Sequence, residues 1–569
     1  MKIKFLVSII LSLTVLTFGQ TGNITNTIAP NGSFLVKDGS NTFLTLSQAN
    51  GFLSLNNSLS LPYTTSSSTG IIFKGADRFI HNYQAQGSDG FNTFVGVNAG
   101  NFTMSGSSNQ ASGNTGVGYS SLSSITIGYL NSAFGFRSLL SNTTGYYNVA
   151  FGGNSLVDNT EGNSNSAFGD AALFYNTTGS SNSACGFGAL TQNTAGNANS
   201  AFGADALYSN ISSDNSAFGS YALFNNTTGG NNSAFGNTSL YSNTTGIFNC
   251  AFGSQSLYYN TTGNCNSAFG VSALDLNTTG KFNSAFGFDA MGYNATGYHN
   301  SSFGDQSLFN NSTGFQNTSV GHKSLFTNVA GFQNTAVGDS ALYYNTGNYN
   351  TALGYNAGSN VTTGANLTLV GIDANPSAGN ATDEITLGNI YVQHLRCNVQ
   401  TITSLSDARD KRNIRDLSLG LDFLMTLKPR LYNWDRREWY TDGKPDGTKM
   451  QQTPTAGFIA QELDTAQINA KAEYLNLVLK SNPERLEATP GNLLPIIVKA
   501  VQELKIKNEQ EKIEKDKEIA DLKIKNQNLE ERLAKYEEIQ SVLVKEFEQI
   551  ESNNRSLKVQ IVNTENKNQ

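Results

Sequence analysis

The chain of 569 residues is too long for one ordinary globular core, and only 14% of its residues are charged. Glycine is abundant, with 56 residues, and proline is scarce, with 9, which excludes collagen, while an apolar content of 38% is too high for simple disorder. The net charge of −7 gives no support for nucleic-acid binding, so no nucleic-acid partner is expected.

Residues 1–19 have the organisation of a secretory signal peptide. Lys2 and Lys4 form a basic start, the apolar stretch 5–18 follows, and the small Gly19 ends the segment. A membrane anchor is the weaker alternative, because a spanning helix needs about 20 apolar residues. No later segment is apolar enough to span a bilayer. We therefore expect a protein that is secreted or at the cell surface, with no stable membrane span after signal removal.

Residues 20–100 are irregular and contain strand-like runs, such as 34–36 and 70–73. A repetitive region follows them, and the open end of a stack of repeats needs a cap. We therefore predict that residues 20–100 form a β-rich cap or attachment region.

A seventeen-residue repeat fills residues 101–372. Its unit is N-S-A-F-G-x-x-A-L-x-x-N-T-T-G-x-x, and the glycine of A-F-G recurs from Gly118 to Gly354 in steps of 17, with two steps of 16. Asparagine lies four residues before each of these glycines, and leucine lies four residues after nearly all of them. A fixed internal period of this kind indicates a stack of identical supersecondary units.

The repeat predicts a β-solenoid with one turn per unit. A-F-G and A-L-[YF] are apolar runs that suffice for two short strands per turn, and N-T-T-G predicts a turn whose glycine takes positive φ. Each turn buries its apolar face against its neighbours, and the asparagines should form a ladder that satisfies buried backbone groups. Because a 17-residue turn encloses little volume, we expect several chains, most simply three, to pack side by side.

The phrase N-[ST]-A-[FV]-G also resembles the head repeats of trimeric autotransporter adhesins and of phage tail fibres, over residues 110–372. That resemblance implies a trimeric β-roll fibre. Charge nearly vanishes across the repeats and returns after Asp383, which marks the main domain boundary. Residues 373–405 are therefore predicted to be a β connector to the next domain.

The cysteines and histidines do not indicate a metal site or a cofactor. Cys185, Cys250, Cys265 and Cys397 show neither metal-ligand spacing nor a dense disulfide pattern, and the four histidines are far apart. Cys250 and Cys265 leave two interpretations open. They form a disulfide between neighbouring repeats or, as we favour, they are small buried thiols in place of Ser and Asn.

Four phrases follow in order over residues 404–507: L-S-D-A-R-D-K-R-N-I-R-D-L, G-L-D-F-L-M-T-L-K-P-R-L-Y-N-W, A-G-F-I-A-Q-E-L and L-L-P-I-I-V-K-A-V-Q-E-L-K. They resemble the intramolecular chaperone domain of endosialidase and other tail-spike proteins, the S74 peptidase family. The resemblance implies an α+β domain at 406–507 that trimerises a fibre, helps it fold and then cuts itself free. It implies Ser406 as nucleophile, Lys411 as its partner and Leu405–Ser406 as the scissile bond.

The residues themselves are compatible with this chemistry. A serine hydroxyl needs a base to remove its proton, and lysine can be that base when desolvation or a cationic neighbour, here Arg409 or Arg412, lowers its pKa. A spacing of five does not put Ser406 and Lys411 on one helical face, so a turn or an extended start must bring them together. Asp407 is expected to cap a helix or, alternatively, to orient the lysine. No histidine follows Lys411, which excludes a Ser–His mechanism in this domain.

Residues 508–569 have the heptad pattern of a coiled coil. The seam is Ile519, Leu522, Leu529, Leu533, Tyr536, Leu543, Phe547, Ile550, Leu557 and Ile561, with Asn526, Gln540 and Asn554 in its gaps. Polar residues at seam positions fix register and strand number. The predicted fold is thus a mainly β fibre, a stacked 17-residue-repeat β-solenoid or β-roll, followed by an α+β chaperone domain and a trimeric coiled coil.

The sequence favours an exported structural and adhesive homotrimeric fibre, with a surface glycan or host receptor as its partner and self-cleavage as its only enzymatic activity. The alternative is a secreted spike that degrades or binds polysaccharide. Glycoside hydrolysis normally needs two opposed carboxylates. Glu161 is the only glutamate between residues 101 and 372, and the aspartates fall at differing repeat positions, so no acid–base pair is obvious. Ice or mineral binding needs rows of threonine on a strand, whereas threonine here clusters in the turn.

Overall fold

The computed structural model describes residues 33–38, 41–47, 53–55, 59–392, 394–396 and 406–565. The expected signal peptide, Cys397 and Leu405 lie outside these ranges. The chain divides into two units, residues 1–317 and 318–569.

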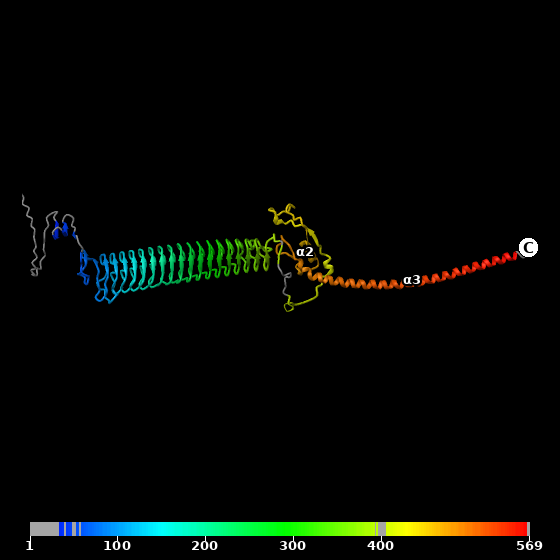
Figure 1. The fold of residues 1–569 in the computed structure, drawn as a ribbon, viewed down its shortest axis with the longest axis horizontal. Helices are drawn as coiled ribbons and strands as arrows, with labels where there is room; N and C mark the ends of the chain where they lie inside the picture. The colour runs from blue at the N-terminus through cyan, green and yellow to red at the C-terminus, as the bar shows by residue number, and fades with distance from the viewer. Residues whose placement is uncertain are drawn as a thin grey trace, which may run out of the picture. The chain divides into compact units, whose positions relative to one another are not determined.

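The first unit is a stack of turns joined by parallel strands (Figure 1). It begins with antiparallel strands, namely β1 (Ser33–Asp38), β2 (Asn41–Ser47) and β3 (Leu53–Leu55) in one sheet, then β4 (Ile72–Lys74) and β5 (Asp77–His81). β5 pairs antiparallel with β6 (Thr93–Val95), and from β6 onward each strand pairs in parallel with the next. The later strands are β7 (Thr115–Val117), β8 (Ser132–Phe134), β9 (Val149–Phe151), β10 (Ser166–Phe168), β11 (Ser183–Cys185), β12 (Ser200–Phe202), β13 (Ser216–Phe218), β14 (Ser233–Phe235), β15 (Cys250–Phe252), β16 (Ser267–Phe269), β17 (Ser284–Phe286) and β18 (Ser301–Phe303).

The predicted solenoid is confirmed, but each turn contributes one strand instead of two. The segment A-L-[YF] does not form the second strand, because Leu223 and Leu240 have φ of 54° and 52°. Tyr221, two residues before Leu223, also has positive φ, at 58°. Strands require negative φ, so this segment is a series of bends. It still bonds to the next turn, since the Leu223 N–H donates to the Ser239 carbonyl at 3.0 Å.

The two glycines of the unit have roles other than those predicted. Gly219, in A-F-G, has the positive φ, at 145°, and a Cβ there would collide with the Gly236 carbonyl of the next turn. Gly229, in N-T-T-G, lies outside the positive-φ region. It is needed for space, since a Cβ would collide with the Gly246 carbonyl and with the Asn226 side chain. The sequence correctly predicted a turn at N-T-T-G. The positive φ, however, belongs to the glycine of A-F-G and not to the glycine of this turn.

Alanine, leucine and two columns of asparagine fill the interior of the stack. Ala217 and Leu223 are fully buried, as are the asparagines of both columns. In the predicted column, the Asn232 N–H donates to Asn215 Oδ1 at 3.0 Å, and Asn232 Nδ2 donates to the Gly246 carbonyl at 2.8 Å. One chain thus closes its own core. The small volume of a turn is therefore no reason in itself for several chains to associate.

The asparagine of N-T-T-G forms the second column. Asn226 Nδ2 donates to Asn210 Oδ1 in the previous turn at 2.7 Å and to the Gly229 carbonyl of its own turn at 2.8 Å. Asn243 in the next turn repeats the pattern by donating to Asn226 Oδ1 at 2.7 Å. Each amide in this column therefore both closes its own turn and bonds to the turns beside it.

The cysteines of the described turns do not form the disulfide that was left open. Cys185, Cys250 and Cys265 are free thiols. Cys250 takes the serine position of S-A-F, as favoured, but it is only partly buried, as is Cys265. Cys185 takes the phenylalanine position and is exposed.

The second unit continues the 17-residue turn and then changes to a small α+β domain with a long helix. Its parallel strands are β19 (Thr318–Val320), β20 (Thr335–Val337), β21 (Thr351–Leu353), β22 (Thr368–Val370) and β23 (Ile385–Leu387). The elements that follow are η1 (Ala408–Asp410), α1 (Leu421–Leu424), β24 (Arg430–Tyr432), η2 (Arg437–Trp439), β25 (Thr455–Gly457), α2 (Ala460–Asn469), η3 (Glu473–Leu475), β26 (Val478–Leu479), β27 (Glu487–Ala488), η4 (Pro490–Leu493) and α3 (Leu494–Glu565).

The short elements between η1 and α3 surround a small core. β24 pairs antiparallel with β25, and β26 with β27. The buried centre consists of Phe423, Leu477, Leu493 and Ile496. Along the described stretches of the chain, no helix combines enough length and apolarity to pass through a bilayer.

A buried histidine lies in the first turns of the stack. The His81 side chain is only 4% exposed and packs between the rings of Phe94 and Phe102, with centroids 4.9 and 4.6 Å away. The neutral ring with its hydrogen on Nε2 satisfies both of its bonds, because Nε2 donates to the Ala99 carbonyl at 2.8 Å and Nδ1 accepts from the Tyr83 N–H at 3.3 Å. Burial, against the opposing hydrogen bond to Ala99 and together with the charge of Arg78, lowers the pKa of His81 from 6.5 to about 4.

We predict that replacing Asn226 with alanine destabilises the stack. The change removes the bonds of the Asn226 amide to Gly229, Asn210 and Asn243. The Gly229 carbonyl and Asn210 Oδ1 keep other donors, so the buried N–H of Asn243 that pointed at Asn226 is the group left unpaired, at a cost of roughly 1–3 kcal/mol. Thermal unfolding and hydrogen exchange of the flanking turns measure the effect. Asn225→Ala is the matched control, because that neighbouring side chain is only partly buried, and it should leave both unchanged. Equal effects of the two changes would contradict the role of the column.

We also predict that acid weakens the first turns of the stack through His81. The folded pKa of about 4 lies below the unfolded value of 6.5, so the contribution of neutral His81 is complete above pH 6.5 and is lost as pH falls towards 4. At about 1.4 kcal/mol per unit of pKa difference, the loss reaches roughly 3 kcal/mol. Hydrogen exchange of residues 77–102, corrected for its intrinsic pH dependence, should rise across this range. His81→Gln should reduce the rise, whereas the exposed His322→Gln should not.

Candidate active site

A single tight turn organises residues 406–411. Asp407 is the N-cap of η1, with extended backbone (φ −68°, ψ 133°), and its carboxylate accepts from the Arg409 N–H at 2.8 Å. At the other end, Lys411 is again extended (φ −113°, ψ 145°), and its N–H donates to the Ala408 carbonyl at 3.2 Å. The chain therefore reverses its direction within these residues, which a continuous α-helix would not allow.

This reversal brings the two predicted catalytic residues together. Lys411 Nζ donates a hydrogen bond to Ser406 Oγ, and it lies 3.4 Å from the Ser406 carbonyl oxygen. A contact of this kind is what proton transfer between a nucleophile and its base requires. Leu405, on the other side of the expected scissile bond, lies outside the described residues.

Ser406 and Lys411 are both exposed in the single chain. In the contact shown, the lysine is the donor, whereas a general base must be neutral and accept the serine proton. Lysine becomes neutral near physiological pH when burial or a nearby cation lowers its pKa. The isolated chain therefore supplies the contact between the two side chains without removing water from around them.

Asp407 interacts with Arg409 instead of Lys411. An Arg409 nitrogen lies 2.5 Å from an Asp407 carboxylate oxygen, and these hydrogen bonds lower the pKa of Asp407 and raise the pKa of Arg409. The lysine-orienting role considered for Asp407 is thus not seen. The pair also compensates the charge of Arg409. Arg412 instead donates to the carbonyls of Arg409 and Lys411, at 2.8 and 2.9 Å, and remains a cation beside the lysine.

Glu503 was not singled out by the sequence, and it links the small domain to the long helix. Its carboxylate, on α3, accepts from the Leu421 N–H at the start of α1 at 2.7 Å. Gly420 precedes α1, and a Cβ at this position would collide with that carboxylate. The bond satisfies a helix N-terminus and places negative charge at its positive end. The sequence signal is only a glycine before a short apolar helix and a glutamate 83 residues later.

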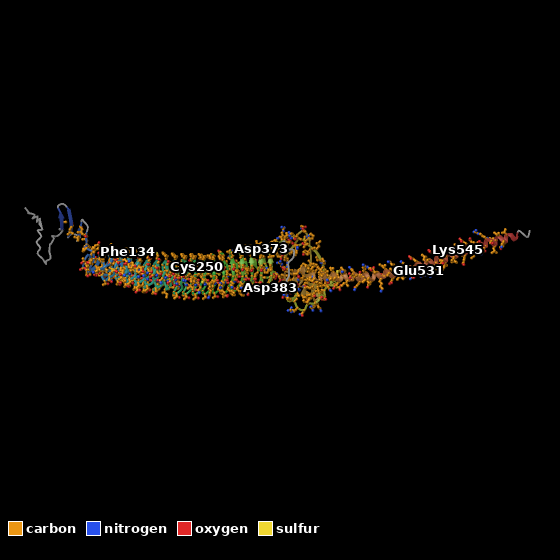
Figure 2. All side chains as sticks on the ribbon, turned by 60° about the horizontal axis from the view of Figure 1, so that its bottom comes forward. Phe134, Cys250, Asp373, Asp383, Glu531 and Lys545 are labelled. Atoms are coloured by element: carbon orange, nitrogen blue, oxygen red, sulfur yellow. The ribbon has the colours of Figure 1, made fainter. Side chains whose placement is uncertain are left out.

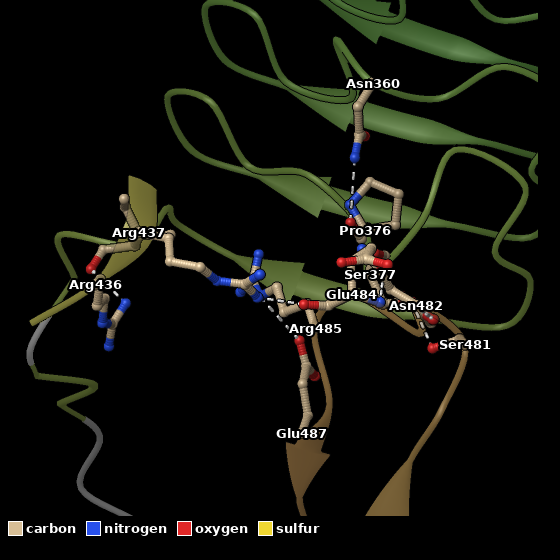
Figure 3. A network of polar contacts seen from close by, with 12 residues as sticks. Asn360, Pro376, Ser377, Arg436, Arg437, Ser481, Asn482, Glu484, Arg485 and Glu487 are labelled. Carbon is tan, nitrogen blue, oxygen red and sulfur yellow. Dashed lines mark hydrogen bonds and ion pairs between the residues drawn. The ribbon is translucent and has the colours of Figure 1, made fainter. Parts of the chain in front are cut away.

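The small domain also contacts the last turns of the second unit's stack (Figure 3). Asn482 Nδ2 donates to the Ser377 carbonyl at 3.0 Å, and the hydroxyls of Ser377 and Ser481 are 2.8 Å apart. Ser377 is itself held by Glu384, whose carboxylate accepts from its N–H at 2.9 Å. The loop between β26 and β27 therefore meets the end of the stack through directed polar contacts.

One pair of aspartates bears on the alternative of polysaccharide degradation. Burial, and secondly the charge of Asp289, raises the pKa of Asp275 to about 6. The two residues occupy different repeat positions on consecutive turns, so the sequence did not indicate that they interact. Within the described residues, no group of three or more His, Cys, Asp or Glu side chains is arranged to hold a metal ion.

Comparison with known proteins identifies the C-terminal segment. Residues 406–471 match the peptidase S74 family, described as chaperone of endosialidase. Searches of the curated proteins and of the solved structures found no match to the chain. The match begins at Ser406 and includes Lys411, η1, α1 and α2. The segment that follows the repeat β-solenoid is therefore similar to the S74 chaperone of endosialidase over residues 406–471, an order that fits a tail-fibre-like protein.

Proposed function

We propose that the protein is an exported, homotrimeric structural and adhesive fibre whose C-terminal domain directs folding and trimerisation and then cuts itself free at Leu405–Ser406. The observation that supports this most is the contact between Lys411 and Ser406 at the first residue of an S74-type domain. The family name denotes both a chaperone and a peptidase, and the domain follows a long stack that has to be assembled.

In the proposed cut, Lys411 in its neutral form takes the proton of the Ser406 hydroxyl. Oγ attacks the carbonyl carbon of Leu405, and the bond between that carbon and the Ser406 nitrogen breaks as Lys411 returns the proton to the nitrogen. The acyl group is then an ester on Oγ. Water hydrolyses the ester, which leaves a carboxylate on Leu405 and a free amino group on Ser406. Burial of the exposed pair by other copies of the chain would supply the desolvation that neutral lysine requires.

The exposed apolar seam of the long helix α3 is evidence for the proposed trimer. It contains 72 residues, and all ten apolar seam residues predicted for the coiled coil are exposed in the single chain, by 50–69%. Glu531 and Lys545, labelled in Figure 2, lie two residues before the seam residues Leu533 and Phe547, which puts both on the outer face of the heptad. An apolar seam of this length is most simply covered by further copies of the same helix.

The same proposal includes the location and the partner of the fibre. The basic and apolar start of the chain supports export, which makes the fibre secreted or attached to the cell surface. A surface glycan or host receptor is the proposed partner, because a repeated surface offers many equivalent weak sites and so gains by multivalency. A polysaccharide-degrading spike is the second candidate, because burial and, secondly, the charge of Asp289 raise the pKa of Asp275, as a general acid requires.

We predict that the exported chain yields two fragments, residues 20–405 and 406–569. Ser406→Ala should leave one intact chain, because it removes the nucleophile. Lys411→Arg keeps the charge but lacks an accessible neutral form, and it should slow the cut at least ~100-fold. Gel analysis with N-terminal sequencing measures both. Ser418→Ala, at an exposed serine of the same segment, should be cut normally. A Ser406→Ala chain that still splits before residue 406 would exclude this mechanism.

We predict that two aspartates in the seam prevent trimerisation. Leu529→Asp with Leu543→Asp would bury uncompensated charge in the coiled coil, at a cost of several kcal/mol per site. Light scattering should then show loss of trimers, and the cut should fail with it if the pair becomes buried only on assembly. Glu531→Asp with Lys545→Asp introduces the same residue on the outer face and should preserve trimers. Normal trimers from the seam variant would refute the role of α3.

A further inference from the structure

A column of outward-facing apolar side chains, each half-buried or exposed, runs along the stack at the position just before the glycine of A-F-G. In each strand the central residue points inward, as Ala217 does, and its neighbours point outward. After Val95 and Val117, the first unit fills the outward position with Phe134, Phe151, Phe168, Cys185, Phe202, Phe218, Phe235, Phe252, Phe269, Phe286 and Phe303. We call this column the phenylalanine ridge; Figure 2 labels Phe134 near its start.

The ridge is apolar in every turn although it faces outward. Phe168 and Phe303 are 45% and 43% exposed, and the phenylalanines from Phe218 to Phe286 are half-buried. The position just after the glycine is also exposed but varies freely, with Phe136, Asp170 and Asn237 among its residues. The second unit keeps the ridge position apolar too, with Val320, Val337, Leu353, Val370 and Leu387. An outward-facing position that never accepts a polar residue indicates a surface that is covered in the functional molecule.

The rings of the ridge stack on one another and leave only their edges outward. Phe202 and Phe218 have centroids 4.7 Å apart with planes inclined by 5°, and Phe269 and Phe286 repeat this at 4.7 Å and 3°. Because both faces of these rings touch neighbours, the ridge offers no flat platform for a sugar ring. It offers instead an apolar edge with one ring per turn.

We propose that the phenylalanine ridge is the surface through which the solenoids of the fibre pack against one another. A surface with one ring every 4.7 Å is matched best by a surface of the same spacing, and a second copy of this chain has that spacing. The exposed seam of α3 favours copies that are parallel and in register, which sets equal turns at equal heights. This inference rests on the proposed homotrimer and names the contact inside it.

Cys185 provides a cross-linking site that tests this packing, because it belongs to the ridge. Its strand pairs Cys185 with Phe168 on one side and with Phe202 on the other, and its thiol is free and exposed. If three ridges face a common axis, three copies of Cys185 meet at one height. A cysteine at Thr178, an exposed residue in the N-T-T-G turn, would lie off the ridge and serves as the matched control.

The test is cross-linking of the assembled full chain with Ser406→Ala to keep it whole. One variant retains Cys185 alone, with Cys250→Ser, Cys265→Ser and Cys397→Ser; the other adds Cys185→Ser and Thr178→Cys. Mild oxidation or a short bismaleimide should convert most of the Cys185 chains into covalent dimers plus leftover monomers, since one thiol per chain joins two of three chains. The Thr178→Cys variant should give less than about a tenth of that yield.

Light scattering before cross-linking shows whether trimers form, and so distinguishes a failure of the ridge contact from a failure of the homotrimer. Trimers without a Cys185 cross-link, or equal yields from the two positions, would overturn the ridge contact and leave the homotrimer intact. Absence of trimers would overturn the homotrimer and the ridge contact together. Within the stack, both variants change only exposed or partly buried side chains, and Cys397 lies outside the described residues. Circular dichroism against the parent chain verifies that the stacks of both variants are folded.

Discussion

The fold depends on side-chain amides that bond from one turn of the stack to the next. A narrow coil encloses backbone carbonyls and N–H groups that water cannot reach, and each unpaired group would cost free energy. Asparagine has both a donor and an acceptor on a short side chain, so it can serve its own turn and its neighbours at once. Asn226 does so by donating to Gly229 and Asn210 while accepting from Asn243. Because each asparagine bonds both within its own turn and to the neighbouring turns, two asparagines recur in nearly every unit.

A fixed turn-to-turn register has consequences on the outside of the stack. Equal positions lie directly above one another, so any side chain repeated in the sequence becomes a continuous column in space. Buried alanine and leucine columns stabilise the single chain, while the outward phenylalanines form a surface whose period only the same kind of stack shares. The constraint that closes the core thereby also produces the surface that we assign to assembly.

In the C-terminal domain, the candidate site forms between residues close in sequence, whereas the bond that joins α1 to α3 links residues far apart in sequence. The turn at η1 brings Ser406 and Lys411 together within six residues, whereas Glu503 joins α1 to α3 across the whole domain. The Glu503 bond therefore joins α1, which begins ten residues after Lys411, to the helix that we propose to register the chains. The exposure of the serine–lysine pair in one chain agrees with a site that assembly completes.

The sequence by itself determined the features that repeat or act locally. The period predicted the solenoid and its asparagine column, four phrases predicted the S74-type domain, and the spacing of Ser406 and Lys411 required a turn. Only the tertiary structure decided what depends on neighbours one turn away. It replaced the second strand by bends with Leu223 at positive φ, moved the positive φ to Gly219, and turned Asp407 towards Arg409. It also brought Asp275 close enough to Asp289 for their charges to interact. The reason is physical: a periodic pattern fixes which residues are equivalent, but the direction of each side chain follows from backbone angles and contacts that a stack sets only once its turns have closed.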